Sequence, residues 1–207
     1  MKIKNKITLL AILPLIFAVA VINLSIYLES RSQLASKLDA LHGQLLNEKR
    51  VELGKYMKMA ETAITKVYAG EDTPENREKV KAILRDLRYD ADGYFFVYDY
   101  KGINQVLGPK PELEGKDLSM LKDSNGIFFV QKIIASARGD DGYVSYLFNK
   151  PSVNKAVPKL SYSKALDKYQ WIMGTGFYID DIDNKIAEQK SIWQQEMRSE
   201  IRFNLLV

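Results

Sequence analysis

The sequence contains no cysteine and a single histidine, His42. Without cysteine the chain can form no disulfide framework, no thiolate zinc site and no cysteine nucleophile. A single histidine also excludes metal sites that need two imidazole ligands. No nucleophile stands beside a base in the pattern, so an enzyme is disfavoured. We expect neither a metal nor a cofactor.

Charge of one sign is not concentrated anywhere along the chain. The formal net charge is +4, and lysines and arginines are interleaved with acids. No basic stripe that would favour a nucleic-acid partner is present. With 207 residues, of which 46% are apolar and 27% charged, the chain has the composition of one packed domain with additional helix.

One long uncharged run lies near the N-terminus. Lys2, Lys4 and Lys6 precede residues 7–28, which carry no charge. At about 1.5 Å per residue this run is long enough to cross a hydrocarbon core of about 30 Å. The preceding lysines predict that residues 1–6 stay in the cytoplasm and that the rest lies outside, in the periplasm or the extracellular space. A cleaved signal peptide is the alternative, but its apolar region would be shorter and would end in a small-residue cleavage site.

Residues 29–69 contain no proline and are rich in helix formers. Apolar residues recur at steps of three and four, at Leu34, Leu38, Leu41, Leu45, Leu53, Tyr56, Ala60, Ala63 and Val67. This spacing predicts a long helix with a narrow apolar seam. The seam needs another helix, which either the C-terminal helix or a second subunit can supply, and we expect a homodimer. We expect His42, beside the seam, to be solvated.

The C-terminal residues 182–207 have apolar positions at helical spacing and end in FNLLV. This pattern predicts an amphipathic helix that leads to a second, truncated membrane segment. A natural C-terminal helix is the alternative.

Between these ends, the pattern changes from helical to alternating. Thr73 followed by Pro74 predicts the N-cap and first residue of a short helix. A second helix is expected over residues 125–137. Alternating apolar residues and turn signals predict five strands at residues 93–99, 102–107, 142–149, 158–166 and 169–179. The expected fold is α+β, with an antiparallel five-stranded sheet hung on a long N-terminal helix.

Aromatic and cationic residues on these strands are candidates for a ligand site. The tyrosine hydroxyls and aromatic rings would line a pocket, and two cations next to the strands could bind a carboxylate through charge-assisted hydrogen bonds. The candidates are Arg88, Tyr94, Phe96, Tyr98, Tyr146, Lys159, Tyr162 and Tyr178. Alternation places Lys159 and Tyr162 on opposite faces and leaves open which one points inward. The tyrosines could instead be sheet core, and the two cations could form surface ion pairs.

The last strand ends in three acids, Asp180, Asp181 and Asp183. At the start of the outgoing helix such carboxylates can cap free amides and meet the positive end of the helix dipole, and we favour this role over metal binding or catalysis. Gly174 and Gly176 would let the strand pass close to a neighbour. We expect the junction of these two glycines with Asp180 and Asp181 to transmit a signal.

Six stretches occur in a fixed order: DGYFFVYDYKG, LEGKDL, KDSNG, GYVSYLFNKP, PKLSYSKAL and WIMGTGFYIDDID. Together they resemble the single Cache domain, in the sub-type that carries a GYFFV…GTGxYIDD signature. The resemblance covers about residues 29–196. It implies a PAS-like sensor core, here residues 70–181, that lies outside the cytoplasm in methyl-accepting chemotaxis proteins and related bacterial transmembrane receptors. It also implies a small organic acid as ligand and signal transduction through the terminal helices.

The chain departs from this family at one position. The family has a His-Pro pair at the end of the second strand, where this chain reads QVLGPKP, with Gly108 and Pro109. A polar pocket group is therefore missing, and a membrane-anchored module without a small ligand is the main alternative. A pilin-like protein is disfavoured, because a short leader ending in glycine and an early glutamate in the apolar segment are absent.

Overall fold

The computed structural model describes the backbone of residues 3–206 and the side chains of residues 12–202. The chain divides into two compact units. We call residues 46–181 the sensor unit, after the family resemblance described above, and residues 1–45 with residues 182–207 the helical unit. The long helix α1 (Ile3–Ala69) contributes to both units, and α4 (Asp180–Leu206) begins at the end of the sensor unit.

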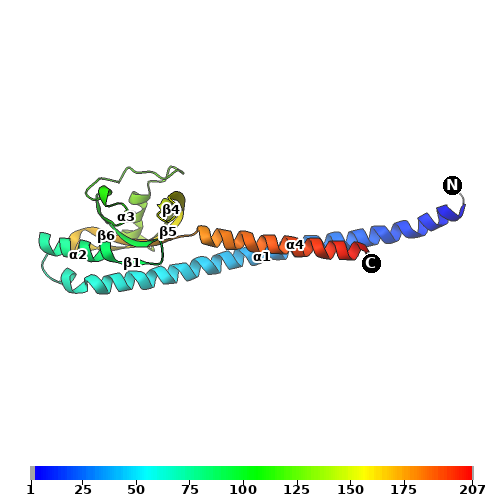
Figure 1. The fold of residues 1–207 in the computed structure, drawn as a ribbon, viewed down its shortest axis with the longest axis horizontal. Helices are drawn as coiled ribbons and strands as arrows, with labels where there is room; N and C mark the ends of the chain where they lie inside the picture. The colour runs from blue at the N-terminus through cyan, green and yellow to red at the C-terminus, as the bar shows by residue number, and fades with distance from the viewer. Residues whose placement is uncertain (1–2, 207) are drawn as a thin grey trace. The chain divides into compact units, whose positions relative to one another are not determined.

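The sensor unit is built on one antiparallel sheet (Figure 1). Its strands are β1 (Arg88–Tyr89), β2 (Gly93–Asp99), β3 (Asn104–Leu107), β4 (Tyr143–Lys150), β5 (Lys155–Leu166) and β6 (Trp171–Tyr178). The order along the sheet is β1-β2-β6-β5-β4. Strand β3 pairs with residues 96–98 of β2, on the same edge of β2 as β1 and beyond the two residues that pair with β1. The expected α+β fold is confirmed. The expectation of five strands was wrong by one, because β1 is only two residues long and carries no alternating pattern.

Helices cover both faces of the sheet, so each face has its own apolar core (Figure 1). One core joins α1 and α2 (Pro74–Asp86) to Phe95 and Val97 of β2. The other joins α3 (Phe129–Gly139) to Tyr94, Phe96 and Tyr98 of the same strand. The alternation expected for β2 is therefore present, with the tyrosines on the α3 side.

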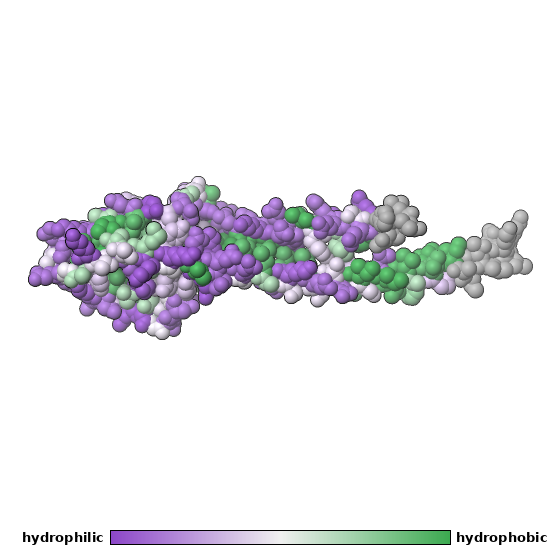
Figure 2. Space-filling model, turned by 90° about the horizontal axis from the view of Figure 1, so that it is seen from below, coloured by the Kyte–Doolittle hydropathy of each residue, from purple (hydrophilic) through white to green (hydrophobic). Residues whose placement is uncertain are grey.

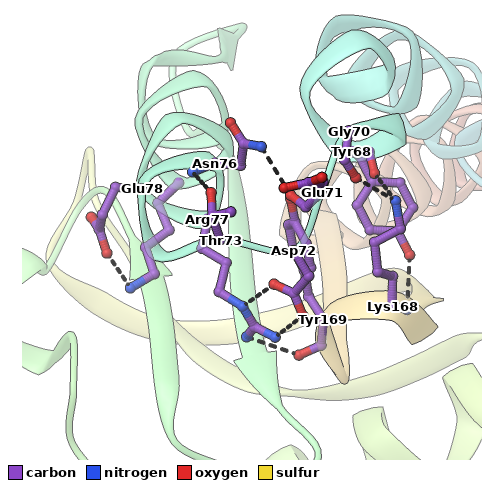
Figure 3. Close-up of polar contacts among 11 residues, drawn as sticks. Tyr68, Gly70, Glu71, Asp72, Thr73, Asn76, Arg77, Glu78, Lys168 and Tyr169 are labelled. Carbon is purple, nitrogen blue, oxygen red and sulfur yellow. Dashed lines mark hydrogen bonds and ion pairs between the residues drawn. The ribbon is translucent and has the colours of Figure 1, made fainter.

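Polar contacts fix the end of α1 to its neighbours (Figure 3). The Lys168 ammonium donates to the backbone carbonyls of Tyr68 and Gly70, which lie at the C-terminal end of α1, where carbonyls lack helical donors. Thr73 caps α2 by accepting a hydrogen bond from the Asn76 amide at 3.2 Å, as the sequence predicts. These contacts close the turn between the two helices against the short 3-10 helix at Asp167–Tyr169.

Helix α3 begins later than the sequence suggests, at Phe129 rather than at residue 125. The reason is Asp123, whose carboxylate accepts hydrogen bonds from the amides of Asn125 and Ile127. This arrangement forms a turn with Gly126 at φ +79° instead of a helix cap. The other oxygen of Asp123 accepts from the Leu147 amide and fastens the turn to β4.

In the helical unit, the seam of α1 faces α4. Leu34 and Leu38 line one groove of about 660 Å³ together with Ile186, Trp193 and Met197. His42 Nε2 lies 3.8 Å from the Asp183 carboxylate. Within the described part of the chain, one helix is long and apolar enough to cross a membrane, and its residues 12–28 present a continuous apolar surface (Figure 2). The expected start of a second membrane segment at residues 203–207 lies outside the described side chains.

Candidate functional site

Lys159 is the most deeply buried charged side chain of the sensor unit, with 1% of its surface exposed. It lies in the middle of β5, opposite Tyr146 of β4 and opposite Tyr178 of β6. This register directs it to the α3 side of the sheet. Tyr162 points to the other side, where it stacks on Tyr143 with ring centroids 4.6 Å apart. Alternation leaves open whether Lys159 or Tyr162 points inward on the α3 side. The structure shows that Lys159 does.

Hydroxyl groups and aromatic rings surround the Lys159 ammonium. Nζ lies 2.8 Å from the Tyr94 hydroxyl, which lies 3.4 Å from the Tyr178 hydroxyl. The Tyr178 hydroxyl donates to the Asn149 carbonyl at 2.6 Å. Nζ also lies 4.0 Å from the ring centroid of Tyr94, 4.9 Å from that of Tyr178 and 5.3 Å from that of Phe148. These cation–π contacts partly compensate for the lost water.

Among the described residues, no carboxylate lies within ion-pair distance of Lys159. The acid that acts on it is Asp92, whose oxygens accept hydrogen bonds from the amide and hydroxyl of Ser152. Burial lowers the pKa of Lys159 to about 7, against a weaker opposite effect of Asp92. A buried ammonium without a counter-charge is costly. The site therefore favours an anion that would approach Nζ.

The nearby phenols stay neutral at physiological pH. Burial raises the pKa of Tyr94 and of Tyr146 well above the ordinary value, and the neighbouring hydroxyls reinforce the shift at Tyr94. Burial also raises the pKa of Tyr178 to about 12. A neutral phenol has one proton to donate, and Tyr178 gives its proton to the Asn149 carbonyl. Tyr94, whose hydroxyl lies beside Lys159 Nζ, is therefore the phenol that can donate to an anion there.

A cavity of about 200 Å³ borders this cluster. Its lining consists of Tyr94, Leu107, Pro109, Lys110, Phe148, Asn149, Pro151 and Asn154. Tyr94 and Phe148 belong both to the cavity wall and to the aromatic shell of Lys159. At about 30 Å³ per water molecule, the volume is that of about six or seven waters, which suits a ligand with a short carbon chain.

Two loops line the cavity, and each is held by an ion pair. Beyond β3, Glu114 accepts from the Leu107 amide at 3.0 Å and pairs with Arg85 of α2 at 2.6 Å. At the β4–β5 turn, Lys150 Nζ lies 3.0 and 3.1 Å from the two carboxylate oxygens of Asp180 and 3.7 Å from Asp181. Asp180, Asp181 and Asp183 lie in the first turn of α4, where the sequence predicts helix-capping carboxylates. The Asp180 carboxylate, however, accepts its described hydrogen bonds from Lys150, next to the cavity loop that contains Pro151.

Gly174 and Gly176 make room for the site. A Cβ at Gly176 would lie 2.9 Å from Lys159 Cε and 2.6 Å from the Leu160 carbonyl oxygen. A Cβ at Gly174 would collide with the ring of Phe96. The close strand approach that the sequence predicts at both glycines is present, and at Gly176 it creates the space for the lysine stem.

The structure brings some of the candidate residues together and leaves others apart. Tyr94, Tyr178 and Lys159 form the cluster beside the cavity, while Phe96, Tyr98 and Tyr146 lie in the buried layer on the same face. Arg88 is exposed, donates to the Leu87 carbonyl and packs against Gly108. Of the eight candidates, Tyr94 alone belongs to the described lining of the cavity, and Lys159 and Tyr178 adjoin the cavity through their contacts with Tyr94. Arg88 lies opposite Tyr94 and so on the same face of the sheet, but β1 is the edge strand, where the side chain is exposed to solvent.

Several lining residues were not anticipated. Lys110 and Asn154 lie in turns, where alternation gives no direction, and Asn149 is the penultimate residue of β4. The signal that could have indicated them is the proline of each turn, Pro109 and Pro151, because proline fixes a loop conformation beside the strands that carry the aromatic candidates.

The model of the family described as Single Cache domain 2 matches residues 45–191. The chain belongs to the single Cache domain 2 family. Over 185 residues it is 35% identical to the sensor histidine kinase MctS of Rhizobium johnstonii, a match that covers 88% of this chain and 40% of the kinase. The chain thus spans well under half of that relative, which contains further parts.

Two solved structures have the same fold. A methyl-accepting chemotaxis protein of Vibrio parahaemolyticus shares 40% identity at a TM-score of 0.69, over 70% of this chain and 99% of the solved one. A Cache chemosensory domain described in terms of carboxylic acid recognition shares 26% identity at a TM-score of 0.61, over 67% and 98% of the two chains. The Cache domain of this chain is therefore a sensor domain of the chemoreceptor and sensor-kinase type, and it is not catalytic.

Proposed function

We propose that this chain is the ligand-sensing part of a bacterial transmembrane receptor and that its sensor unit binds a short-chain carboxylate. The observation that carries the proposal is Lys159, a buried ammonium that has phenol partners and no acidic partner among the described residues. The carboxylate would accept hydrogen bonds from Lys159 and Tyr94, while the Tyr178 hydroxyl stays bonded to the Asn149 carbonyl. The likeness to a Cache domain that recognises carboxylic acids supports the same ligand class.

The size of the cavity limits the affinity. A ligand of four to six heavy atoms gains at most about 1.5 kcal/mol per atom, or about 6 to 9 kcal/mol in total. The corresponding dissociation constants run from tens of micromolar to high nanomolar. This range suits a sensor of nutrients in the environment.

The signal would leave through the terminal helices. The apolar residues 7–28 would anchor the chain in the cell membrane, so that the sensor unit lies in the periplasm or outside the cell. Lys150 links the cavity loop to Asp180, the first residue of α4. A ligand that moves this loop would shift the start of α4, and the groove of the helical unit would receive a second copy in a homodimer. We do not expect a nucleic acid among the partners of this chain.

The test is binding of small acids to the 207-residue chain in lipid nanodiscs. Thermal shift and calorimetry against acetate, propionate, pyruvate and lactate, with short amines as a counter-panel, should give micromolar binding of at least one acid and none of the amines. Lys159→Met should abolish it, and Lys155→Met, an exposed lysine on the same strand, should leave it unchanged. If no acid binds, the chain is better described as a membrane-anchored interaction module.

A further inference from the structure

The groups around Lys159 bear on the protonation state of its side chain as well as on ligand binding. Every element that packs on the ammonium presents a neutral group to it. Strand β2 contributes Tyr94 and Phe96, β4 contributes Tyr146 and Phe148, and β6 contributes Tyr178. The charged groups nearby are Asp92, which is engaged by Ser152, and Lys110 in the cavity wall. Beside the Tyr178 ring lies Lys150 as well, 5.9 Å from the ring centroid and paired with Asp180.

The unliganded site therefore holds its lysine in an environment that disfavours the charged form. The Nζ atom has one hydrogen-bond partner, the Tyr94 hydroxyl, among the residues that the structure describes. An ammonium has three protons to donate, so a single described partner leaves two of them without an acceptor. A neutral amine has one donor fewer and can itself accept the proton of Tyr94, so this partner suits the neutral form better. The geometry is thus compatible with a neutral lysine before the ligand arrives.

A bound carboxylate reverses this preference. A negative charge in direct contact favours the ammonium form, and it does so strongly inside a site that excludes water. We propose that carboxylate binding is coupled to the uptake of a proton by Lys159, so that the site captures the acid and a proton together. This inference rests on the proposed function, because it concerns the same ligand and the same lysine.

The coupling fixes how affinity depends on pH. Burial lowers the pKa of Lys159 to about 7 in the unliganded chain. At pH 7 about half of the molecules would then need to take up a proton in order to bind. Below pH 7 the apparent affinity should be nearly flat. Above pH 7 it should fall about tenfold per unit, so that the dissociation constant at pH 8 is about tenfold larger than at pH 6.

Calorimetry in two buffers measures the proton directly. The 207-residue chain in nanodiscs is titrated with the acid from the test panel that binds most tightly, at pH 7, in PIPES and in Tris, whose ionisation enthalpies differ. The difference in apparent enthalpy should correspond to uptake of about half a proton per site. The dissociation constant is then measured at pH 6, 7 and 8. Lys159→Arg keeps a permanent charge, so any binding that this variant retains should be independent of pH over this range.

The outcomes separate the two proposals. Binding with uptake of a proton and a tenfold loss of affinity between pH 6 and pH 8 supports the inference. Binding with the same affinity at both values and no buffer-dependent enthalpy overturns it and leaves the proposed function intact. Failure of every acid to bind overturns both. An NMR titration of ¹³C-labelled lysine in the unliganded chain gives an independent reading, and a Lys159 that titrates near 10.5 would also overturn the inference.

Discussion

Lys150 holds both carboxylate oxygens of Asp180, at 3.0 and 3.1 Å, and so joins the last residue of β4 to the first residue of α4. The side chains are 13% and 26% exposed, so the pair is largely shielded from solvent. Lys150 directly precedes Pro151, which lines the cavity. If the proposed ligand moves the cavity loop, this ion pair would carry the movement to the start of α4.

Lys150→Met should loosen the start of α4. The amides of residues 184–186 donate to carbonyls one helical turn earlier, so they report on the first turn. A shielded ion pair of this kind contributes about 1 kcal/mol, and its loss should speed hydrogen exchange of these amides about fivefold. Hydrogen–deuterium exchange measured by mass spectrometry on the 207-residue chain is the readout. Lys155→Met serves as control, and equal exchange in the two variants would show that the ion pair does not hold the helix start.

Lys159→Met should stabilise the unliganded chain while abolishing its binding. The pKa of Lys159 is about 7 in the folded chain and about 10.5 when unfolded. The unfolded chain thus binds more protons between these values, so the stability of the wild type should rise as pH increases from 7 towards 10. At pH 7 the methionine, which needs no hydration, should raise the free energy of unfolding by about 1–3 kcal/mol.

Urea unfolding at pH 7 and at pH 9 tests this expectation. The wild type should gain stability between the two values relative to Lys159→Met, because only the wild type carries the titrating amine. Lys155→Met provides the matched background for other titrating groups. A variant less stable than the wild type at pH 7 would mean that the folded chain accommodates the charged lysine without penalty.

Gly176→Ala should destabilise the sensor unit by about 1–3 kcal/mol, since the new Cβ would lie too close to the Leu160 carbonyl and to Lys159 Cε. Because the lysine stem must move, binding of small acids should weaken as well. Gly54→Ala is the matched control. Its Cβ meets no atom within 4 Å, and it lies inside α1, where alanine is the better helix former, so this variant should be as stable as the wild type or more stable. Thermal denaturation of the two variants distinguishes local crowding from a general effect of replacing glycine.

The sequence predicts the sheet well and the cavity only in part. Alternation groups Tyr94 with Phe96 and Tyr98 on one face of β2, and Tyr146 with Phe148 on one face of β4. The structure places both groups in the same core. It could not decide between Lys159 and Tyr162, because alternation defines two faces without saying which one meets α3. The register of β5 against β4 and β6, which brings Lys159 opposite Tyr146 and Tyr178, settles this.

The positions of the loops that line the cavity could not be predicted from the sequence, for a different reason. Lys110 and Asn149 approach each other only because β3 pairs with β2 while β4 lies across β5 and β6, at the other side of the sheet. Such an approach depends on long-range pairing, and no local pattern encodes it. The first turn of α4 could be predicted in part. The cluster of acids indicates where the helix begins, but it does not indicate that Asp180 pairs with Lys150.

The loop beyond β3 offers a last prediction, based on the pair between Arg85 and Glu114. Glu114 fixes the loop by accepting from the Leu107 amide while Arg85 holds the carboxylate in place. Burial alone would raise the pKa of Glu114, but the hydrogen bonds from Arg85 and Leu107 outweigh it and the pKa is lowered. This contribution to stability is present above the ordinary carboxyl pKa of about 4.5 and is lost as the pH falls through the lower folded value.

Arg85→Met should therefore free the loop and let a bound acid escape faster, because Leu107, Pro109 and Lys110 line the cavity. The dissociation rate should rise several-fold with a smaller change in the association rate, as is usual for contacts that close over a ligand. Stopped-flow measurements with the acid that binds, with Lys79→Met as an exposed control on the same helix, give both rates. If Arg85→Met leaves the dissociation rate unchanged, the loop does not limit release, and the ligand must leave past the β4–β5 turn instead.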